Sequence, residues 1–206
     1  MSDERLPRPP QTLILASGNH GKLTELRELM AHLPCTIRPV SEFCSRSPEE
    51  TGTTFVENAI IKARHACEVS GHAAIADDSG IIVDALSGEP GVRSARFAGP
   101  EASDEDNLVL LLKRLEGIPE TERGARFVSV VVCMRHANDP LPLVAEGVWE
   151  GYVTRAPRGE NGFGYDPVFG LHGRVQTPAE LPPEEKNELS HRGQALRRLL
   201  RAAGWT

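Results

Sequence analysis

The chain has 206 residues, of which 39% are hydrophobic and 25% charged, so it is long enough for one large domain with a substantial core. Its formal net charge of −6 argues against a nonspecific nucleic-acid-binding protein, because such proteins usually carry a basic excess. No apolar run in the sequence approaches the roughly 20 residues that a membrane span needs. We therefore expect a globular protein that binds neither nucleic acid nor membrane.

The N-terminal residues are charged and rich in proline, and they lack the apolar segment of a signal peptide. We expect residues 1–11 to form a disordered leader and residues 12–206 to form a single two-lobed domain. The cysteines form no CxxC pair and have no histidine at zinc spacing, which favours reduced thiols in a cytoplasmic protein. These cysteines are Cys35, Cys44, Cys67 and Cys133.

The first elements form a strand–loop–helix unit. Residues 12–16 are an apolar run typical of a buried strand, and a glycine-containing turn follows at residues 17–22. Apolar residues then recur at helical spacing from Leu23 to Leu33, where Pro34 ends the pattern. A second strand is predicted near residues 36–40.

The next helix has clear start and stop signals. Thr54 and Glu57 have the spacing of a capping box, which satisfies free amide groups at a helix start, and Gly71 ends the segment. One face of this helix is apolar. Asn58 and Lys62 lie on another face, so we expect their polar groups to point together.

Residues 73–76 predict a strand that leads directly into Asp77-Asp78-Ser79-Gly80, with an extended pattern resuming at residues 81–83. Ligands of α/β proteins usually bind at such strand ends. Adjacent residues in an extended chain point to opposite faces. One aspartate is therefore expected to take part in site chemistry while the other supports the backbone.

The second half is rich in strands. Ser103 and Asp106 predict another helix start, residues 127–134 and 143–153 predict two long paired strands, and residues 190–203 predict a final helix. This order of elements indicates an α/β fold with a mixed sheet flanked by helices.

Three groups of residues suggest nucleotide chemistry. Residues 17–22 fail the P-loop pattern, because Ala16 and Leu23 stand where glycine and Ser/Thr are needed, yet amides and a lysine at a helix start suit a phosphate. The alternative is a turn with a solvent-facing lysine.

The second group is acidic. Asp78 could act as a general base or metal ligand, with Glu50 as a second carboxylate for Mg²⁺. The alternative there is a solvated acidic turn.

The third group lies near the C-terminus. Phe163 stands between glycines and offers a π-face for a nucleobase, while His191 and Arg192 supply donors for a ring carbonyl or phosphate. Taken one at a time, these residues have simpler interpretations: a buried aromatic turn within the core, a histidine that is a satisfied surface or capping group, and an exposed Lys186. The joint occurrence of all three groups indicates an enzyme that acts on a nucleotide.

These segments, in this order, resemble the inosine triphosphate pyrophosphatase family, also called the dITP/XTP pyrophosphatases. The matching stretches are Ala16–Lys22, Glu50–Ala59, Ala76–Gly80, Phe163–Asp166, Glu185-Lys186 and Ser190–Gly193. The resemblance implies Mg²⁺-dependent hydrolysis of deaminated purine nucleoside triphosphates (ITP, dITP, XTP and dXTP) to the monophosphate and pyrophosphate, which cleanses the nucleotide pool. It also implies an elongated mixed α/β fold with a nucleotide cleft between two lobes, usually as a homodimer.

The resemblance assigns residue roles by position. Asp78 would be the general base and a metal ligand, and Glu50 a second metal-linked carboxylate. Phe163 would stack on the base while Asp166, His191 and Arg192 read its edge, because an arginine donor suits the 6-keto group of hypoxanthine or xanthine. The expected substrate-binding set is Ser17, Gly18, Asn19, His20, Gly21, Lys22, Lys62, Ser79, Phe163, Gly164, Tyr165, Asp166, Lys186, His191 and Arg192.

The chain departs from the family pattern outside the proposed catalytic set. Arg93 stands where an aromatic residue is commoner, Gln176-Thr177 replaces a usual Lys-Thr pair, and the leader is longer than the family core requires. Two other functions fit the same residues. One is a nucleotide hydrolase of different base specificity or one that removes the terminal phosphate, and the other is a non-enzymatic nucleotide-binding regulator.

Overall fold

The structure is a computed structural model that describes residues 8–205. It contains a six-stranded sheet in the order β2-β1-β3-β4-β5-β6. Strand β1 is parallel to β2 and β3, whereas β5 and β6 are antiparallel, so the sheet is mixed. The strands are β1 Thr12–Leu15, β2 Thr36–Pro39, β3 Ala73–Val83, β4 Gly124–Met134, β5 Leu143–Val153 and β6 Phe169–Leu171. The predicted α/β class is confirmed. Most of the expected leader, residues 1–7, lies outside the described residues.

The chain divides into two compact units. The first unit contains the chain up to Asp78, residues 129–147 and residues from Arg192 onward. The second contains residues 79–128 and 148–191. Strands β3, β4 and β5 each contribute residues to both units.

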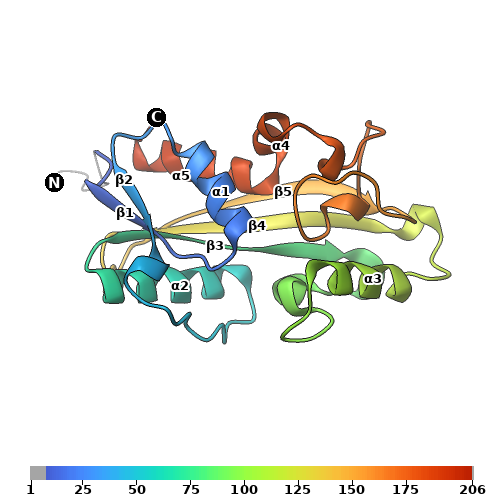
Figure 1. The fold of residues 1–206 in the computed structure, drawn as a ribbon, viewed down its shortest axis with the longest axis horizontal. Helices are drawn as coiled ribbons and strands as arrows, with labels where there is room; N and C mark the ends of the chain where they lie inside the picture. The colour runs from blue at the N-terminus through green and yellow to red at the C-terminus, as the bar shows by residue number, and fades with distance from the viewer. Residues whose placement is uncertain (1–7, 206) are drawn as a thin grey trace. The chain divides into compact units, whose positions relative to one another are not determined.

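In the first unit, α1 and α5 lie on one side of the strands and α2 on the other (Figure 1). Their bounds are α1 His20–Leu29, α2 Phe55–Ser70 and α5 His191–Ala203. The core joins apolar side chains of α1 and α5 to β1, β3 and β4, including Leu13, Leu15, Leu26, Met30, Ile75, Val131, Leu196 and Leu199. The α2 boundaries confirm the predicted capping box of Thr54 and Glu57 and the predicted stop at Gly71, whose φ is +70°.

In the second unit, α3 Asp104–Arg114 and the short helix α4 Pro183–Leu189 lie on opposite sides of the strands (Figure 1). The core contains Ile81, Val83, Leu111, Leu115, Phe127, Val153, Val168, Phe169 and Leu181. Ser103 and Asp106 form the predicted capping box of α3. The remaining short helices are 3₁₀ turns at Val40–Glu42, Asp84–Leu86, Gly91–Arg96, Glu120–Glu122, Asp166–Val168 and Pro178–Glu180.

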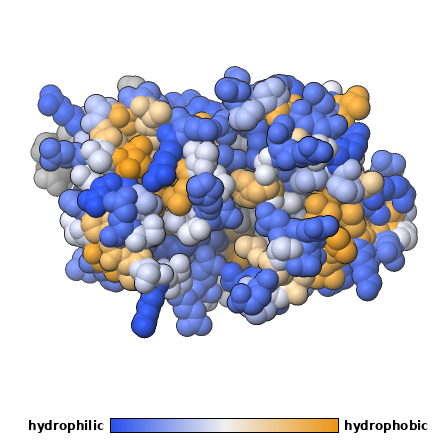
Figure 2. Space-filling model, viewed as in Figure 1, coloured by the Kyte–Doolittle hydropathy of each residue, from blue (hydrophilic) through white to orange (hydrophobic). Residues whose placement is uncertain are grey.

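Hydrophilic residues dominate the molecular face in Figure 2, with smaller groups of apolar residues between them. None of the helices within residues 8–205 is both long enough and apolar enough to span a membrane.

The structure corrects one expectation about β3. The strand does not end before Asp77 but continues through Asp77-Asp78-Ser79-Gly80 to Val83, so both aspartates lie in mid-strand. The reason is that the Asp77 and Asp78 side chains both find partners and Gly80 allows a close approach. A Cβ atom at Gly80 would lie 2.3 Å from the hydroxyl of Ser94 and 2.5 Å from the carbonyl oxygen of Gly91.

Candidate active site

The two aspartates of β3 point to opposite sides of the strand, as the alternation of an extended chain requires. In the first unit, Asp77 bonds to Lys22 of α1 and Arg192 of α5, which lie on one side. Asp78 bonds to Asn58 and Lys62 of α2, which lies on the other side. The described hydrogen bonds and ion pairs of the two adjacent carboxylates therefore come from helices on opposite sides of the strand.

The Asp77 carboxylate is buried among cations. Lys22 Nζ lies 3.1 Å from Asp77 Oδ2, Arg192 Nε lies 3.4 Å from the same oxygen, and the Ser129 hydroxyl donates to Oδ1. Burial opposes ionisation, but the charges of Lys22 and Arg192 outweigh it and hold the pKa of Asp77 below its ordinary value. Arg192 also forms an ion pair with Glu25. Asp77 thus acts as an ionised anchor between α1 and α5.

Lys22 is the last residue of the segment, residues 17–22, that was predicted to bind a phosphate. The Asn19 side chain caps α1 by accepting a 2.9 Å hydrogen bond from the Lys22 amide. Burial lowers the pKa of Lys22 below its ordinary value, and the charge of Asp77 only partly offsets this. The alternative of a solvent-facing lysine is wrong, because the ammonium group is ion-paired and its side chain is 15% exposed.

Asp78, Lys62 and Glu50 form the second group. Lys62 Nζ lies 2.6 Å from Asp78 Oδ1 and 3.1 Å from Glu50 Oε1, so one ammonium group bridges both carboxylates. Asn58 donates to the other oxygen of Asp78 at 3.4 Å. Burial raises the pKa of Asp78 above its ordinary value despite the charge of Lys62. A carboxylate with a raised pKa is suited to accept a proton near neutral pH.

This group also has the donors that a divalent cation needs. Glu50 and Asp78 already face a common cation, the Lys62 ammonium group. Within residues 8–205 no cluster of three or more His, Cys, Asp or Glu side chains could hold a metal ion. Two carboxylates nevertheless fit Mg²⁺, which usually takes one or two protein carboxylates and completes its shell with water and substrate phosphates.

In the second unit, the aromatic segment is organised around Asp166. The Asp166 carboxylate accepts a 2.9 Å hydrogen bond from the Phe163 amide and a 2.7 Å bond from Lys186 Nζ. The same Lys186 ammonium group lies over the Phe163 ring, 4.9 Å from its centroid. Lys186 is only 6% exposed, so the reading of it as an exposed lysine is wrong.

Two other predicted residues are buried. The Tyr165 ring belongs to the core of the second unit, and its hydroxyl donates a 2.8 Å hydrogen bond to the Ser94 carbonyl. The His191 ring stacks on Phe127 with 4.8 Å between centroids and 11° between planes. His191 is 6% exposed, so it is not the surface histidine of the simpler reading.

Comparison with known proteins places this geometry in a family. The model of the Ham1 family matches residues 13–202. The chain belongs to the Ham1 family. The dITP/XTP pyrophosphatase of Idiomarina loihiensis is 53% identical over 193 residues, covering 92% of this chain and 96% of the relative. The dITP/XTP pyrophosphatase of Escherichia coli O157:H7 is 52% identical over 192 residues, with 93% and 98% covered.

Solved structures of Ham1 proteins have the same fold. The HAM1 protein from Coxiella burnetii superposes with a TM-score of 0.84 at 50% identity, over 91% of this chain and 95% of that one. A dITP/XTP pyrophosphatase from Mycobacterium abscessus superposes with a TM-score of 0.73 at 44% identity, over 92% and 98% of the two chains. The resemblance identified from the sequence is therefore confirmed over nearly the whole chain.

The structure of this Ham1 chain groups the predicted residues by unit. Glu50, Lys62 and Asp78 come together in the first unit, and Phe163, Asp166 and Lys186 in the second. Gly18, Asn19 and His20 are exposed and Gly21 half-buried at the start of α1, and Ser79 is half-buried beside Asp78. The described bonds of Arg192 go to Asp77 and Glu25, and all three residues belong to the first unit.

Three side chains of the first-unit site were not among the predicted site residues. Glu25 pairs with Arg192, Ser129 donates to Asp77, and Asn58 donates to Asp78. A signal existed for each of them. Glu25 lies one helical turn after Lys22, Ser129 interrupts an apolar strand, and Asn58 lies one turn before Lys62.

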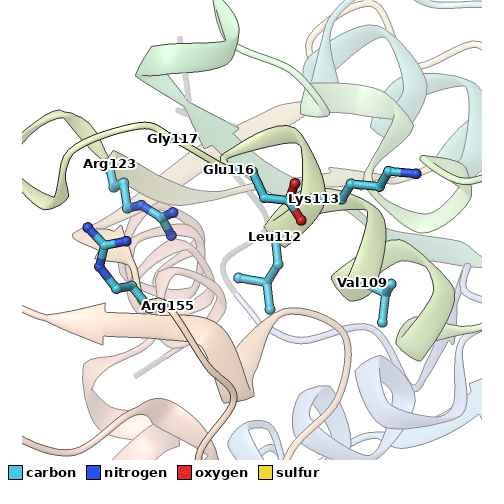
Figure 3. Close-up of a pocket in the computed structure, with 7 residues that line it drawn as sticks. All are labelled: Val109, Leu112, Lys113, Glu116, Gly117, Arg123 and Arg155. Atoms are coloured by element: carbon cyan, nitrogen blue, oxygen red, sulfur yellow. The ribbon is translucent and has the colours of Figure 1, made fainter.

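A separate pocket of about 460 Å³ lies at the C-terminal end of α3 in the second unit (Figure 3). Its lining residues are Val109, Leu112, Lys113, Glu116, Gly117, Arg123 and Arg155. The Arg123 guanidinium donates to the carbonyl oxygens of Leu115, Ile118 and Thr154. Arg123 therefore links the end of α3 to the residue that follows β5.

Proposed function

We propose that this protein hydrolyses deaminated purine nucleoside triphosphates, dITP/ITP and XTP/dXTP, to the nucleoside monophosphate and pyrophosphate. The observation that carries the proposal is the group of Asp78, Lys62 and Glu50, in which a buried carboxylate of raised pKa lies beside a cation and a second carboxylate. The curated Ham1 relatives that match the chain are named dITP/XTP pyrophosphatases, which supports the same reaction.

Asp78 is the proposed general base. Its carboxylate takes a proton from the attacking water while the bond between the α- and β-phosphates breaks and pyrophosphate leaves. Lys62 holds Asp78 Oδ1, so the oxygen bonded more weakly, to Asn58 at 3.4 Å, is the better placed to accept that proton. Lys22 and Lys62 supply positive charge for the phosphates. Mg²⁺ held by Glu50 and Asp78 would neutralise further charge on the phosphate oxygens.

Phe163 is the proposed stacking surface for the base. Lys186 covers one face of its ring, so we assign the base to the other face. Asp166, Lys186 and His191 supply polar groups for the base edge, together with the main chain of Gly164 and Tyr165. Arg192 bonds to Asp77 through Nε and to Glu25 through Nη1, so its expected edge-reading role would fall to the other N–H groups of the guanidinium.

The proposed setting is the cytoplasm, where such an enzyme would remove damaged purine nucleotides before they enter DNA or RNA. The four cysteines are free thiols, as expected in a reducing compartment. We further propose a homodimer, on the family resemblance alone.

The products of dITP turnover test the proposal. We expect Mg²⁺-dependent release of pyrophosphate and dIMP in equal amounts, abolished by EDTA and restored by excess Mg²⁺. Release of orthophosphate would indicate removal of the terminal phosphate instead. Tight binding of dITP without turnover in the presence of Mg²⁺ would favour a nucleotide-binding regulator.

A further inference from the structure

The Phe163–Asp166 segment, here called the base loop, is a tight turn closed by its own groups and by Lys186 Nζ, which donates a 2.7 Å hydrogen bond to the Asp166 carboxylate. Asp166 closes the turn by accepting from the Phe163 amide through its side chain, while its own amide donates to the Phe163 carbonyl at 3.3 Å. These bonds fix the shape of the turn. They do not fix where the turn lies relative to the rest of the second unit, so external contacts must do that.

One external contact is the buried Tyr165 side chain. The Tyr165 hydroxyl donates a hydrogen bond to the Ser94 carbonyl. Ser94 is itself fixed, because its own hydroxyl accepts from the Ile81 amide at 2.9 Å and donates to the Gly91 carbonyl at 2.6 Å. The inner side of the base loop is therefore attached to the segment that follows β3.

The outer side of the base loop is attached through Gly164. Its amide donates a 2.8 Å hydrogen bond to Oδ2 of Asp104, which is 60 residues away in sequence and is the first residue of α3. Gly164 has a φ of +61°, a left-handed conformation that is strained for residues with a side chain. The bond to Asp104 holds the tip of the turn in this conformation.

Asp104 is not needed to cap α3. The Ser103 hydroxyl accepts from the Asp106 amide, and the Asp106 carboxylate accepts from the Ser103 amide and hydroxyl. These two residues complete the capping box by themselves. The Asp104 carboxylate is thus available to the base loop, and its charge makes the bond to the Gly164 amide stronger than a neutral one.

We infer that Asp104 is a positioning residue that holds the tip of the base loop, and with it the Phe163 ring, in the place needed to accept a purine. The expected effect on KM for dITP rests on the proposed function. The structural consequence, protection of the Gly164 amide, does not depend on activity.

Three variants distinguish this positioning role of Asp104 from a general effect of its charge or of helix stability. Asp104→Ala removes the acceptor, Asp104→Asn keeps an oxygen acceptor without the charge, and Glu105→Ala removes an equivalent acidic side chain from the same helix turn. Glu105 is exposed and makes no described contact with the base loop. It is therefore a matched control for charge and for helix stability.

The first measurement is hydrogen–deuterium exchange of the ligand-free protein, followed in a peptide that covers the base loop. We expect faster exchange in Asp104→Ala than in wild type, near-wild-type exchange in Asp104→Asn, and no change in Glu105→Ala. Unchanged exchange in Asp104→Ala would overturn the inference, whatever the activity of the protein.

The second measurement is steady-state turnover of dITP. For Asp104→Ala we expect KM to rise about five-fold with kcat within about two-fold of wild type, the size expected for loss of one hydrogen bond that positions a binding group. Asp104→Asn should restore most of the loss, and Glu105→Ala should match wild type. An equal loss in Asp104→Ala and Glu105→Ala would show a helix effect and overturn the inference. If wild type fails to turn over dITP, the proposed function fails, and the exchange result still decides the structural claim.

Discussion

At the scale of single residues, Asp77 and Asp78 show how neighbouring carboxylates acquire different properties. Asp77 faces two cations and a hydroxyl, which hold its pKa below its ordinary value. Asp78 faces a single lysine and an amide, and there burial dominates and raises its pKa. The neighbouring groups, and not the residue type, therefore determine which aspartate is the ionised anchor and which is the proposed base.

The two aspartates should respond differently to the same substitution. Asp78→Asn should lower kcat by about 10²–10⁴-fold, because the proton acceptor is lost, while the thermal midpoint changes little. Asp77→Asn should instead lower the free energy of unfolding by about 3–5 kcal/mol, because Lys22 and Arg192 lose their buried counter-charge. Turnover of dITP and chemical denaturation of both variants check this pair. A stable Asp77→Asn protein, or an active Asp78→Asn protein, would contradict the assignment.

Phe163 gives a second residue-level prediction. Phe163→Leu should raise KM for dITP by about ten-fold, because stacking of one base on an aromatic ring contributes about 1–3 kcal/mol. Phe163→Tyr keeps a π-face and serves as the control that should retain most of the affinity. Steady-state kinetics decide the matter, and equal KM values for the Leu variant and wild type would remove the stacking role.

At the scale of elements, local signals predicted helices better than they predicted β3. The capping boxes at Thr54 and Ser103 were readable because they depend on residues three apart. The continuity of β3 was not readable, because Asp-Asp-Ser-Gly is typical of turns. The strand persists there because partners distant in sequence satisfy its side chains, such as Lys22 for Asp77 and Lys62 for Asp78. The seven-residue helix α4 was also missed, since its charged sequence has no apolar periodicity.

For the candidate site too, contacts between residues distant in sequence could not be predicted from local spacing. Asn58 and Lys62 could be placed on one helix face by their spacing, but their partner Asp78 could not be identified from spacing. Burial of Lys186 and the bonds of Arg192 depend on how distant segments pack. Motif resemblance thus supplied the candidate residues, and the packing determines which of their charges face each other.

The loop between β4 and β5 gives a prediction about pH. Asp139 accepts from the Arg135 amide, the Arg135 guanidinium and the Leu141 amide, and these donors hold the pKa of Asp139 below its ordinary value. A carboxyl with a depressed folded-state pKa stabilises the fold above its unfolded pKa of about 3.9, and this contribution is lost as pH falls toward the folded value.

Asp139→Asn should therefore lower the free energy of unfolding by about 1–2 kcal/mol at pH 7. The difference from wild type should shrink as pH falls below about 4. Urea denaturation across this pH range measures both effects. A difference that stays constant down to pH 2 would show that the Asp139 charge does not stabilise the loop.

At the scale of the whole molecule, an acidic chain must bind a more acidic substrate. The net charge of −6 repels a triphosphate, so local cations must supply the attraction. In the first unit, we propose Lys22 and Lys62 for this role, and both are paired with carboxylates in the structure. Mg²⁺ held by Glu50 and Asp78 would add positive charge to that of the lysines.

The most direct test of the central claim is base selectivity. We would compare kcat/KM for pyrophosphate release from dITP, XTP, dGTP and dATP with excess Mg²⁺. The account predicts that dITP and XTP exceed dATP by at least about ten-fold, the factor expected when a buried donor is left unpaired by the 6-amino group of adenine. It predicts that they also exceed dGTP, on the family resemblance alone, because guanine has the same 6-keto group. Equal values for all four nucleotides would contradict a purine-cleansing role and leave a pyrophosphatase without base selectivity.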